Sequence, residues 1–311
     1  MKMNFNALLS LMRPLEWSKT FGNMVFGYLL ALFISFGFVS FENFDFVLFF
    51  LAFLSAGPLL WGGLYALNDF TDFENDKFHS VKNSRPIPSG KVSEKTALVF
   101  SLSMIFLSLL IGIYFFLSFN NFLFLFCLIA MLVNQLLYTV KPFHFKSKPV
   151  LDLLSGSVVN PFFRFYSGWV LVFHSFNAPL LILLFVVGIQ FAGFSLYRLS
   201  SKELEEKLGY KSSMLVFGEK KVLFFSYFVG LVGVSSFVLM TLTYKFFPEL
   251  IFLGNLPSKF LWLVVLSILL LPLYLDALLF PKKMDLKKMY RIMYFHNIFF
   301  IAGFILLFFI N

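Results

Sequence analysis

The sequence is poor in cysteine and lacks the common spacings of metal-binding and nucleophilic motifs. Its single cysteine, Cys127, excludes an intrachain disulfide. The four histidines, at positions 79, 144, 174 and 296, are too dispersed for a zinc-binding motif. The sequence contains no phosphate-cradling glycine-rich loop and no Gly-x-Ser-x-Gly motif. Disulfide-stapled, zinc-dependent and serine-hydrolase classes are therefore disfavoured.

Charge is also scarce, and apolar side chains take its place. Only 13% of the 311 residues are charged, whereas 59% are hydrophobic. A soluble domain must face water with its outside, and this composition leaves too little polar surface for that. It predicts an integral membrane protein in contact with lipid. The net charge of +9 does not indicate a nucleic-acid partner, because the basic residues lie in short loops between apolar segments.

Nine apolar segments are long enough to cross a bilayer, where only helices satisfy their own backbone groups. Residues 1–20 carry no evident cleavable signal peptide and instead predict an interfacial helix. We therefore expect an all-α membrane protein of about nine transmembrane helices, with a single domain over residues 1–311. The predicted spans are Phe21–Val39, Phe46–Leu67, Ala97–Phe119, Phe122–Val140, Val150–Phe173, Pro179–Tyr197, Val222–Tyr244, Phe260–Phe280 and Ile292–Ile310.

Basic residues alternate between the loops. The N-terminal segment and the loops after the second, fourth, sixth and eighth segments carry most of them, whereas the intervening loops hold only Lys245 and Lys259. The positive-inside rule then predicts a cytoplasmic N-terminus and an external C-terminus, with the plasma membrane as the expected location. The two longest and most polar cytoplasmic loops, 68–96 and 198–221, are the predicted site loops.

The end of the second segment carries the strongest chemical signal. Asn68, Asp72 and Asp76 recur every four residues, and Asp69 lies seven before Asp76, so a helix places all four on one broad face. Such close carboxylates repel one another at a membrane boundary. Mg²⁺ relieves that repulsion, suits oxygen ligands and accepts phosphate oxygens as further ligands. The alternative is a solvated helix end with scattered acids.

A basic stretch follows the acids at once. Lys82 and Arg85 precede a predicted turn that contains Pro86, Pro88 and Gly90. With a metal on the acids, Lys82 and Arg85 are expected to grip the remaining oxygens of a diphosphate. Taken alone, either residue also fits ordinary positive-inside charge.

Together these residues resemble the first signature of the UbiA family of intramembrane prenyltransferases. Two further stretches, Arg13-Pro14-Leu-Glu-Trp17-Ser-Lys19 and Tyr138-Thr-Val-Lys141-Pro142, are similar to that family as well. The resemblance covers nearly the whole chain. It implies a UbiA-like bundle with a central cavity open to the cytoplasmic side, Mg²⁺ as cofactor, and phosphate contacts from Tyr138 and Lys141.

The second acidic motif of that family, an Asp-x-x-x-Asp in the loop after the sixth segment, is altered here. Ser201 stands at the first acidic position and Glu205 at the second, with Glu203 between them, while the Gly209-x-Lys211-Ser-Ser tail fits. The resemblance implies that Glu203 and Glu205 orient a second metal or the acceptor, and that Lys211 contacts substrate. Alternatively, these glutamates and the neighbouring lysines form an exposed, salt-bridged helix.

Two charges, Asp152 and Arg164, stand inside the fifth segment. They are separated by about 18 Å along a helix, so they cannot pair directly unless Pro161 breaks it. Intramembrane charges usually face a cavity or one another. We expect both to face substrate, with a structural contact between helices as the alternative.

The predicted function is Mg²⁺-dependent transfer of a polyprenyl group from an isoprenoid diphosphate to an aromatic or lipid acceptor. A competing branch of the same family transfers phosphoribose from phosphoribosyl diphosphate to a polyprenyl phosphate. The altered second motif favours that branch, whereas the Gly209-x-Lys211-Ser-Ser tail favours ring prenylation. A secondary transporter or channel is the alternative from another class. It would distribute its acids along the membrane depth, whereas here they gather at one boundary. The acceptor, the chain length and the oligomeric state stay open.

Overall fold

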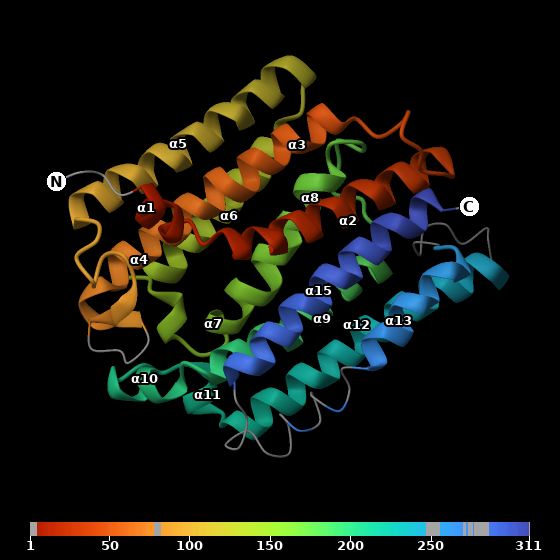
Figure 1. Cartoon of the computed structure of the whole chain (residues 1–311). Coiled ribbons are helices and arrows are strands. Elements are labelled where there is room, and N and C mark those ends of the chain that lie inside the picture. The colour runs from red at the N-terminus through yellow and green to blue at the C-terminus, as the bar shows by residue number, and fades with distance from the viewer. Residues whose placement is uncertain are drawn as a thin grey trace.

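The computed structural model describes residues 5–77, 82–246, 256–269, 272, 276 and 286–310. Within these residues the regular structure is entirely helical, which confirms the predicted fold class (Figure 1). The longer helices are α2 (Trp17–Phe36), α5 (Glu94–Phe119), α6 (Phe122–Thr139), α9 (Leu180–Leu199), α12 (Glu219–Phe246) and α15 (Leu286–Phe309).

Seven helical stretches have the length and apolar composition needed to cross a membrane. They correspond to predicted segments one to four, six, seven and nine. The fifth segment is helical from Leu151 to Trp169 but is not among the seven. The eighth begins with η7 (Ser258–Phe260) and α13 (Leu261–Ile268), and most of its remainder lies outside the described residues. The total of nine therefore stays a prediction.

The second segment is one long helix with a local change of pitch. It runs through α3 (Phe46–Leu54), the π-helical η2 (Ser55–Trp61) and α4 (Gly62–Asp76). Pro58 lies inside the π-helical turn, where its missing N–H interrupts the regular hydrogen-bond ladder. Because α4 continues past the apolar residues to Asp76, the acidic motif is helical, as its spacing predicts.

The fifth segment is built in the same way. Helix α7 (Leu151–Leu154) passes through the π-helical η5 (Ser155–Val159) into α8 (Asn160–Trp169). Pro161 is the second residue after the π-helical turn, and the chain stays helical through it to Trp169, so it does not break the helix. Arg164 stays on α8, well away from Asp152.

Helix α8 packs tightly across α2. A Cβ atom on Gly168 would lie 2.0 Å from the carbonyl oxygen of Met24, and one on Gly27 would lie 2.4 Å from that of Phe165. Only glycine permits so close a backbone approach. Around this crossing, buried aromatic rings such as Tyr166 and Trp169 fill the core.

The polar connections gather at one end of the bundle. There lie α1 (Phe5–Leu11), η1 (Pro14–Glu16), the end of α4, α10 (Lys202–Lys207) and α11 (Ser213–Val216), together with η3 (Lys82–Ser84) and η4 (Phe145–Ser147) (Figure 1). Helix α1 buries Ala7, Leu8 and Leu11 in a small apolar cluster that also contains Ala66 of α4. This packing fixes the N-terminal segment beside the acidic motif.

Candidate active site

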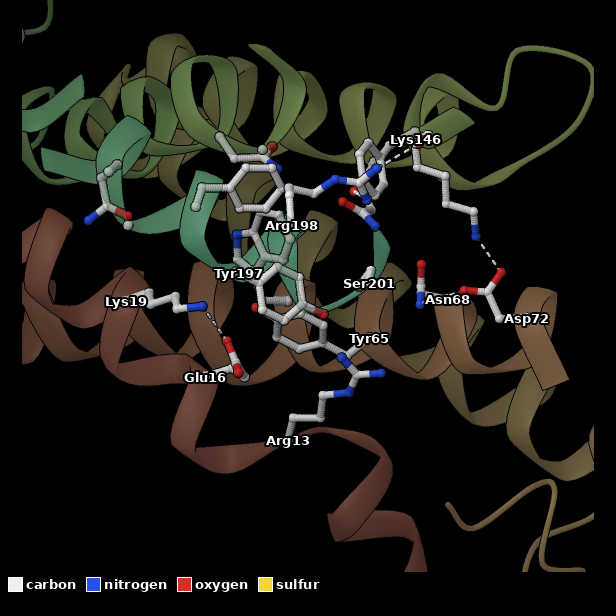
Figure 2. A pocket seen from close by; sticks show the side chains of 18 of the residues that line it. Arg13, Glu16, Lys19, Tyr65, Asn68, Asp72, Lys146, Tyr197, Arg198 and Ser201 are labelled. Carbon is white, nitrogen blue, oxygen red and sulfur yellow. Dashed lines mark hydrogen bonds and ion pairs between the residues drawn. The ribbon is translucent and has the colours of Figure 1, made fainter. Parts of the chain in front are cut away.

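A cavity of about 280 Å³ opens between the polar end of the bundle and its interior (Figure 2). Helices α4, α6, α8, α9 and α15 contribute to its wall, as do the N-terminal segment and α10. Its charged lining residues are Arg13, Glu16, Lys19, Asp72, Asp76, Arg85, Lys146, Arg164, Arg198 and Glu205. Cationic and acidic side chains therefore line one shared cavity.

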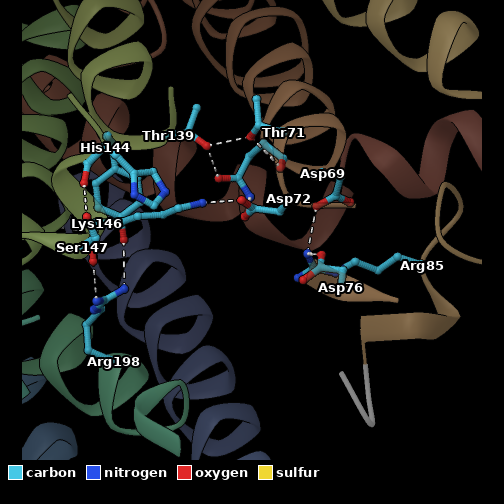
Figure 3. Close-up of polar contacts among 12 residues, drawn as sticks. Asp69, Thr71, Asp72, Asp76, Arg85, Thr139, His144, Lys146, Ser147 and Arg198 are labelled. Carbon is cyan, nitrogen blue, oxygen red and sulfur yellow. Dashed lines mark hydrogen bonds and ion pairs between the residues drawn. The ribbon is translucent and has the colours of Figure 1, made fainter. Parts of the chain in front are cut away.

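Two of the α4 carboxylates converge on one guanidinium. Arg85 Nη1 donates to Asp69 Oδ1 at 3.0 Å and to Asp76 Oδ2 at 2.7 Å (Figure 3). Arg13 also pairs with Asp69. The pair lies seven residues apart, as the helix face predicts, and both carboxylates are 2% exposed. Charge-assisted bonds of this kind offset the cost of burying them.

The other half of the motif faces α6 and the loop after it. Asn68 Nδ2 donates to Asp72 Oδ2 at 3.2 Å, and the Thr139 hydroxyl donates to the side-chain oxygen Asn68 Oδ1 at 3.0 Å. Lys146 pairs with the second oxygen of Asp72 (Figure 3). Both residues line the cavity, and these contacts fix the orientation of the Asn68 amide and the Asp72 carboxylate there.

The donor set fits a hard divalent cation in its chemistry. It consists of carboxylate and amide oxygens, the ligands that Mg²⁺ prefers. In the described part of the chain no three His, Cys, Asp or Glu side chains converge closely enough to hold a metal in this conformation. Asp69, Asp72 and Asp76 are each paired with Arg or Lys instead. Metal binding there requires those cations to be displaced.

Arg198 forms a second, deeply buried network. Its Nη2 atom lies 2.8 Å from Glu205 Oε1 and 3.3 Å from Asp152 Oδ2, and it donates to the Lys146 carbonyl at 3.0 Å. Its Nη1 atom donates to the Tyr138 hydroxyl at 3.2 Å. Asp152 also accepts the backbone N–H of Ser213 at 3.0 Å. One guanidinium thus ties α6, α7, α9 and α10 together.

Arg164 lies on the same cavity but in different surroundings. Its guanidinium carbon stands 3.8 Å from the centre of the Trp61 ring, a cation–π contact. The amide residues Asn160 and Gln135 line the cavity with it. The cavity is therefore polar and cationic on this wall as well as beside the acids.

A second cavity of about 420 Å³ adjoins the first. The two share Lys19, Ile189, Gln190, His296 and Asn297 in their walls. The second is mostly apolar, with Phe26, Phe185, Phe237, Phe300 and Phe304 among its lining residues. A molecule with a charged head and a long hydrocarbon tail matches this pair of spaces.

The loop after α6 presents a histidine that stays neutral near physiological pH. Burial lowers the pKa of His144 to about 4, and the neighbouring Lys146 acts in the same direction. The imidazole meets the Tyr210 ring edge-on, with 5.2 Å between ring centres. Burial raises the pKa of the Tyr210 hydroxyl to about 12. Both side chains are uncharged at neutral pH.

Comparison with known proteins decides the family. The model of the UbiA prenyltransferase family matches residues 24–304, which is most of the chain. The chain belongs to the UbiA prenyltransferase family. The sequence resemblance is thereby confirmed. No curated protein sequence matches the chain.

Solved structures of other UbiA proteins share the fold of this chain. A UbiA homolog from Archaeoglobus fulgidus bound to GPP and Mg²⁺ is 19% identical, with a TM-score of 0.68 over 96% of this chain and 98% of that one. A digeranylgeranylglyceryl phosphate synthase is 20% identical, with a TM-score of 0.65 over 97% of both chains. The apo form of a UbiA homolog from Aeropyrum pernix K1 is 17% identical, with a TM-score of 0.66 over 92% of this chain and 97% of that one.

The structure brings together most of the residues that the sequence singles out. The cavity is lined by Asn68, Asp72, Asp76, Arg85, Tyr138, Arg164 and Glu205. Asp69 and Asp152 lie directly behind this lining, paired with Arg85 and Arg198. We expected Asp152 to contact substrate. Its buried carboxylate instead accepts hydrogen bonds from Arg198 and Ser213, an arrangement that favours a structural role.

Other predicted residues lie elsewhere. Lys141, Glu203 and Lys211 have exposed side chains and are not among the residues that line the cavity. For Lys211, the structure shows a backbone N–H bonded to the Ser147 carbonyl at 3.0 Å. The side chain of Lys82 lies outside the described part of the chain.

Sequence reasoning missed three cations that contact the acids. Arg13 figured only in the family resemblance, Lys146 only as loop charge, and Arg198 only as the start of the second site loop. Lys146 pairs with Asp72 across 74 positions of sequence, a separation that local spacing cannot reveal. For Arg198 a sequence signal existed, since a charge in the last turn of an apolar segment often faces a cavity or another charge, and the structure buries it there.

Proposed function

We propose that this chain transfers an isoprenyl group from an isoprenoid diphosphate to an acceptor within the membrane, with Mg²⁺ as cofactor. The observation that carries this proposal is the pairing of a charged cavity with an apolar one. Asn68, Asp72 and Asp76 face Arg85 and Lys146 in the first, and hydrocarbon-lined space continues in the second. The structural relatives bound to GPP or DMAPP with Mg²⁺ support the same donor class.

Asn68, Asp69, Asp72 and Asp76 are the proposed holders of the metal. A Mg²⁺ ion held by these residues would supply positive charge against the negative charge that develops on a departing diphosphate. Arg85 and Lys146 now rest on these carboxylates. Both basic side chains line the cavity, where a guanidinium and an ammonium would donate to phosphate oxygens.

In the proposed reaction no covalent bond forms between the protein and either substrate. The allylic C–O bond breaks and its electron pair leaves on the diphosphate. A nucleophilic atom of the acceptor forms the new bond to the allylic carbon and releases its proton. The aromatic walls of the apolar cavity hold the tail and exclude water, which would otherwise capture the electrophilic carbon.

The proposed orientation follows the charge of the loops. The polar end of the bundle carries the basic segments, so we place it and the N-terminus on the cytoplasmic side, with the C-terminus outside. The whole chain acts as one domain in this proposal. A soluble diphosphate head then reaches the acids without crossing the hydrocarbon.

The test uses purified full-length protein in lipid nanodiscs. One arm supplies labelled geranylgeranyl diphosphate with a panel of ring and lipid acceptors. A second arm supplies labelled phosphoribosyl diphosphate with a polyprenyl phosphate. We expect label transfer in the first arm with Mg²⁺ and none with EDTA. Transfer confined to the second arm would reassign the chain to phosphoribosyl transfer.

Variants link the activity to the acids. Asp72→Ala removes a cavity-lining carboxylate and should lower turnover by at least about a hundredfold, the size of effect seen when a transition-state stabilising group is lost. Glu206→Gln changes an exposed acid of α10 and serves as the matched control. Unchanged turnover in Asp72→Ala would remove the metal assignment.

A further inference from the structure

We propose that His296 of α15 is the base that takes the proton from the acceptor as the new bond to carbon forms. This inference rests on the proposed function and deepens it, because it assigns a step that neither the acids of α4 nor their basic partners perform. The observations that carry it are the place of His296 between the two cavities and an unpartnered nitrogen of its ring.

Helix α15 passes along both cavities in order. Met293 and Tyr294 line only the charged cavity, and Phe300 and Phe304 line only the apolar one. His296 stands between them and lines both. Because each turn of a helix advances by about 5.4 Å, this order follows depth in the bundle. His296 therefore lies at the level where the charged cavity passes into the apolar one.

Two other helices cross this boundary in the same way. On α9, Tyr197 lines only the charged cavity and Phe185 only the apolar one, with Gln190 in the wall of both. On α2, Lys19 lines both cavities and Phe26 lines the apolar one alone. The junction between the cavities consists of the residues shared by both walls, which are Lys19, Ile189, Gln190, His296 and Asn297.

The reacting carbon of the donor belongs at this junction. In the proposed function the diphosphate head occupies the charged cavity and the hydrocarbon tail occupies the apolar one. The bond that breaks joins head and tail, so the allylic carbon lies where the cavities meet. The acceptor atom that attacks this carbon must come within bonding distance of it, and it releases its proton at the same level.

His296 offers a proton-accepting nitrogen at this level. Its Nε2 atom is buried, and among the described residues that atom has no hydrogen-bond partner. A neutral imidazole carries a proton on one ring nitrogen and a lone pair on the other, so an unpartnered nitrogen can accept a proton. The centre of the Phe300 ring lies 6.3 Å from that of the imidazole, which places the imidazole at the edge of the apolar wall. Histidine is the side chain used most often for such proton transfers.

The other polar residues of the junction cannot perform this step. Lys19 pairs with Glu16 at 2.7 Å as an ammonium group, which already carries its full set of protons (Figure 2). Gln190 and Asn297 are amides, which do not act as bases near neutral pH. Among the described residues that line the apolar cavity there is no carboxylate. His296 is therefore the base that the described part of the junction supplies.

The proposed step balances without a further reagent. The acceptor atom uses an electron pair to bond to the allylic carbon, and the electron pair of the breaking C–O bond leaves on the diphosphate. The proton of the acceptor passes to Nε2 of His296, which becomes an imidazolium. Because His296 also lines the charged cavity, the imidazolium can return that proton to water or to the departing diphosphate. The Glu16 carboxylate offsets the charge of Lys19, so the ammonium opposes this protonation little.

The experiment measures a single turnover in lipid nanodiscs. Full-length protein in excess over labelled geranylgeranyl diphosphate is mixed with Mg²⁺ and the acceptor that the wild type uses, and the transferred label is followed in time. His296→Gln keeps a polar side chain but cannot take the proton, so the rate constant should fall at least about a hundredfold, the lower range for a lost general base. Equilibrium binding of the donor without acceptor should stay within about twofold, because the lost group acts in the transition state.

An exposed histidine provides the matched control. His174 lies in the loop after α8 and is not among the residues that line either cavity. His174→Asn removes an imidazole at a position where asparagine tolerates the positive φ of 21°, and this variant should react at the wild-type rate. Equal losses in His174→Asn and His296→Gln would show a general effect of histidine removal and overturn the inference.

Chemical rescue separates proton transfer from a structural role. His296→Ala opens space for a small ring at the junction, and free imidazole should raise the rate of this variant at least about tenfold. Pyrrole has a ring of the same size but no basic nitrogen, so it should leave the rate unchanged. An equal response to both rings, or to neither, overturns the inference. This comparison also decides the matter if His296→Gln does not fold.

The two proposals fail in different ways. No label transfer by the wild type from the isoprenoid diphosphate to any acceptor overturns the proposed function and, with it, the role of His296. Transfer by the wild type at a rate that His296→Gln leaves within about threefold overturns the role of His296 alone. The departing diphosphate would then be the base, and the donor class and the acids of α4 would keep their assignments.

Discussion

The Arg198 guanidinium lies 2.8 Å from the Glu205 carboxylate, and both side chains are buried. Glu205 stands where the second acidic motif of the family ends, and Ser201, at its start, supplies no carboxylate. A cation of the chain itself therefore neutralises the acid that would face a second metal. The first motif, on α4, contributes three oxygen-bearing side chains to the cavity wall: Asn68, Asp72 and Asp76.

We predict that a single Mg²⁺ suffices for activity. The rate should follow the free Mg²⁺ concentration as a one-site hyperbola, because Ser201 supplies no carboxylate to complete a second site with Glu205. Asp76→Asn should raise the half-saturating concentration at least about tenfold, whereas Glu205→Gln should move it by less than about threefold. A sigmoidal dependence that Glu205→Gln makes hyperbolic would contradict this prediction and restore a second metal.

Asp152 should prove more important for stability than for chemistry. It is fully buried and receives Arg198 together with the backbone N–H and hydroxyl of Ser213. Replacing it by Asn leaves Arg198 with less compensation, which for a buried pair costs about 3 kcal/mol. Thermal unfolding of Asp152→Asn should show this loss, and Glu206→Gln should show none. An unaltered midpoint would mean that Glu205 alone satisfies Arg198.

Local periodicity explains what the sequence could predict. The spacing of Asn68, Asp72 and Asp76 placed them on one helix face, and α4 confirms it. The turn residues Pro86 and Gly90 predicted the turn that the chain forms there, with Gly90 at φ +73°. These features depend on neighbours within a few residues, so they can be predicted from the local sequence pattern.

The rest of the site depends on tertiary packing. Arg13 meets Asp69 across 56 positions, and Arg198 meets Asp152 across 46. No spacing rule connects such residues, because the connection is made by how whole helices cross. The same holds for Trp61 and Arg164. Pro58 is the sequence signal inside the π-helical η2, and η5 contains no proline.

His144 should give the protein a specific sensitivity to mild acid. The pKa of His144 in the folded chain, about 4, lies below the ordinary value of 6.5. Between these two pH values the imidazole is protonated in the unfolded chain and neutral in the folded one. This contribution to stability is complete above pH 6.5 and is lost as the pH falls from there toward 4. The unfolding midpoint measured across that range should show it.

His144→Asn supplies the comparison, since asparagine tolerates the positive φ of 45° at this position. Carboxylates titrate in both proteins and cancel in the difference. The midpoint of the wild type relative to the variant should fall as the pH is lowered from 6.5 to 4. A difference that stays constant over that range would refute the assigned pKa.

The crossing of α2 and α8 should not accept a methyl group. Gly168→Ala would place Cβ 2.0 Å from the Met24 carbonyl oxygen, and a backbone atom in a packed core cannot move aside cheaply. We expect a loss of about 2 to 3 kcal/mol or more. Gly303→Ala is the matched control, because its Cβ meets only the tip of Leu263 at 2.8 Å. Equal midpoints for the two variants would show that the helices are free to separate.

The apolar cavity should set the length of the isoprenoid tail. Val234 of α12 lines it, and Val234→Phe fills part of the space that a longer tail needs. The value of kcat/KM for geranylgeranyl diphosphate should fall at least about tenfold, which is within the range that a few displaced methylenes produce. The value for geranyl diphosphate should change by less than about threefold, because a shorter tail leaves that region empty.

Leu239→Phe provides the control for this tail-length prediction. It lies on the same helix but points outward, with 47% of its surface exposed, so it enlarges a side chain without entering the cavity. Both donors should react with this variant as they do with the wild type. Equal losses for the two donors in Val234→Phe would mean that the substitution disturbs the charged cavity through their shared wall. Loss for the shorter donor alone would show that the tail runs in another direction.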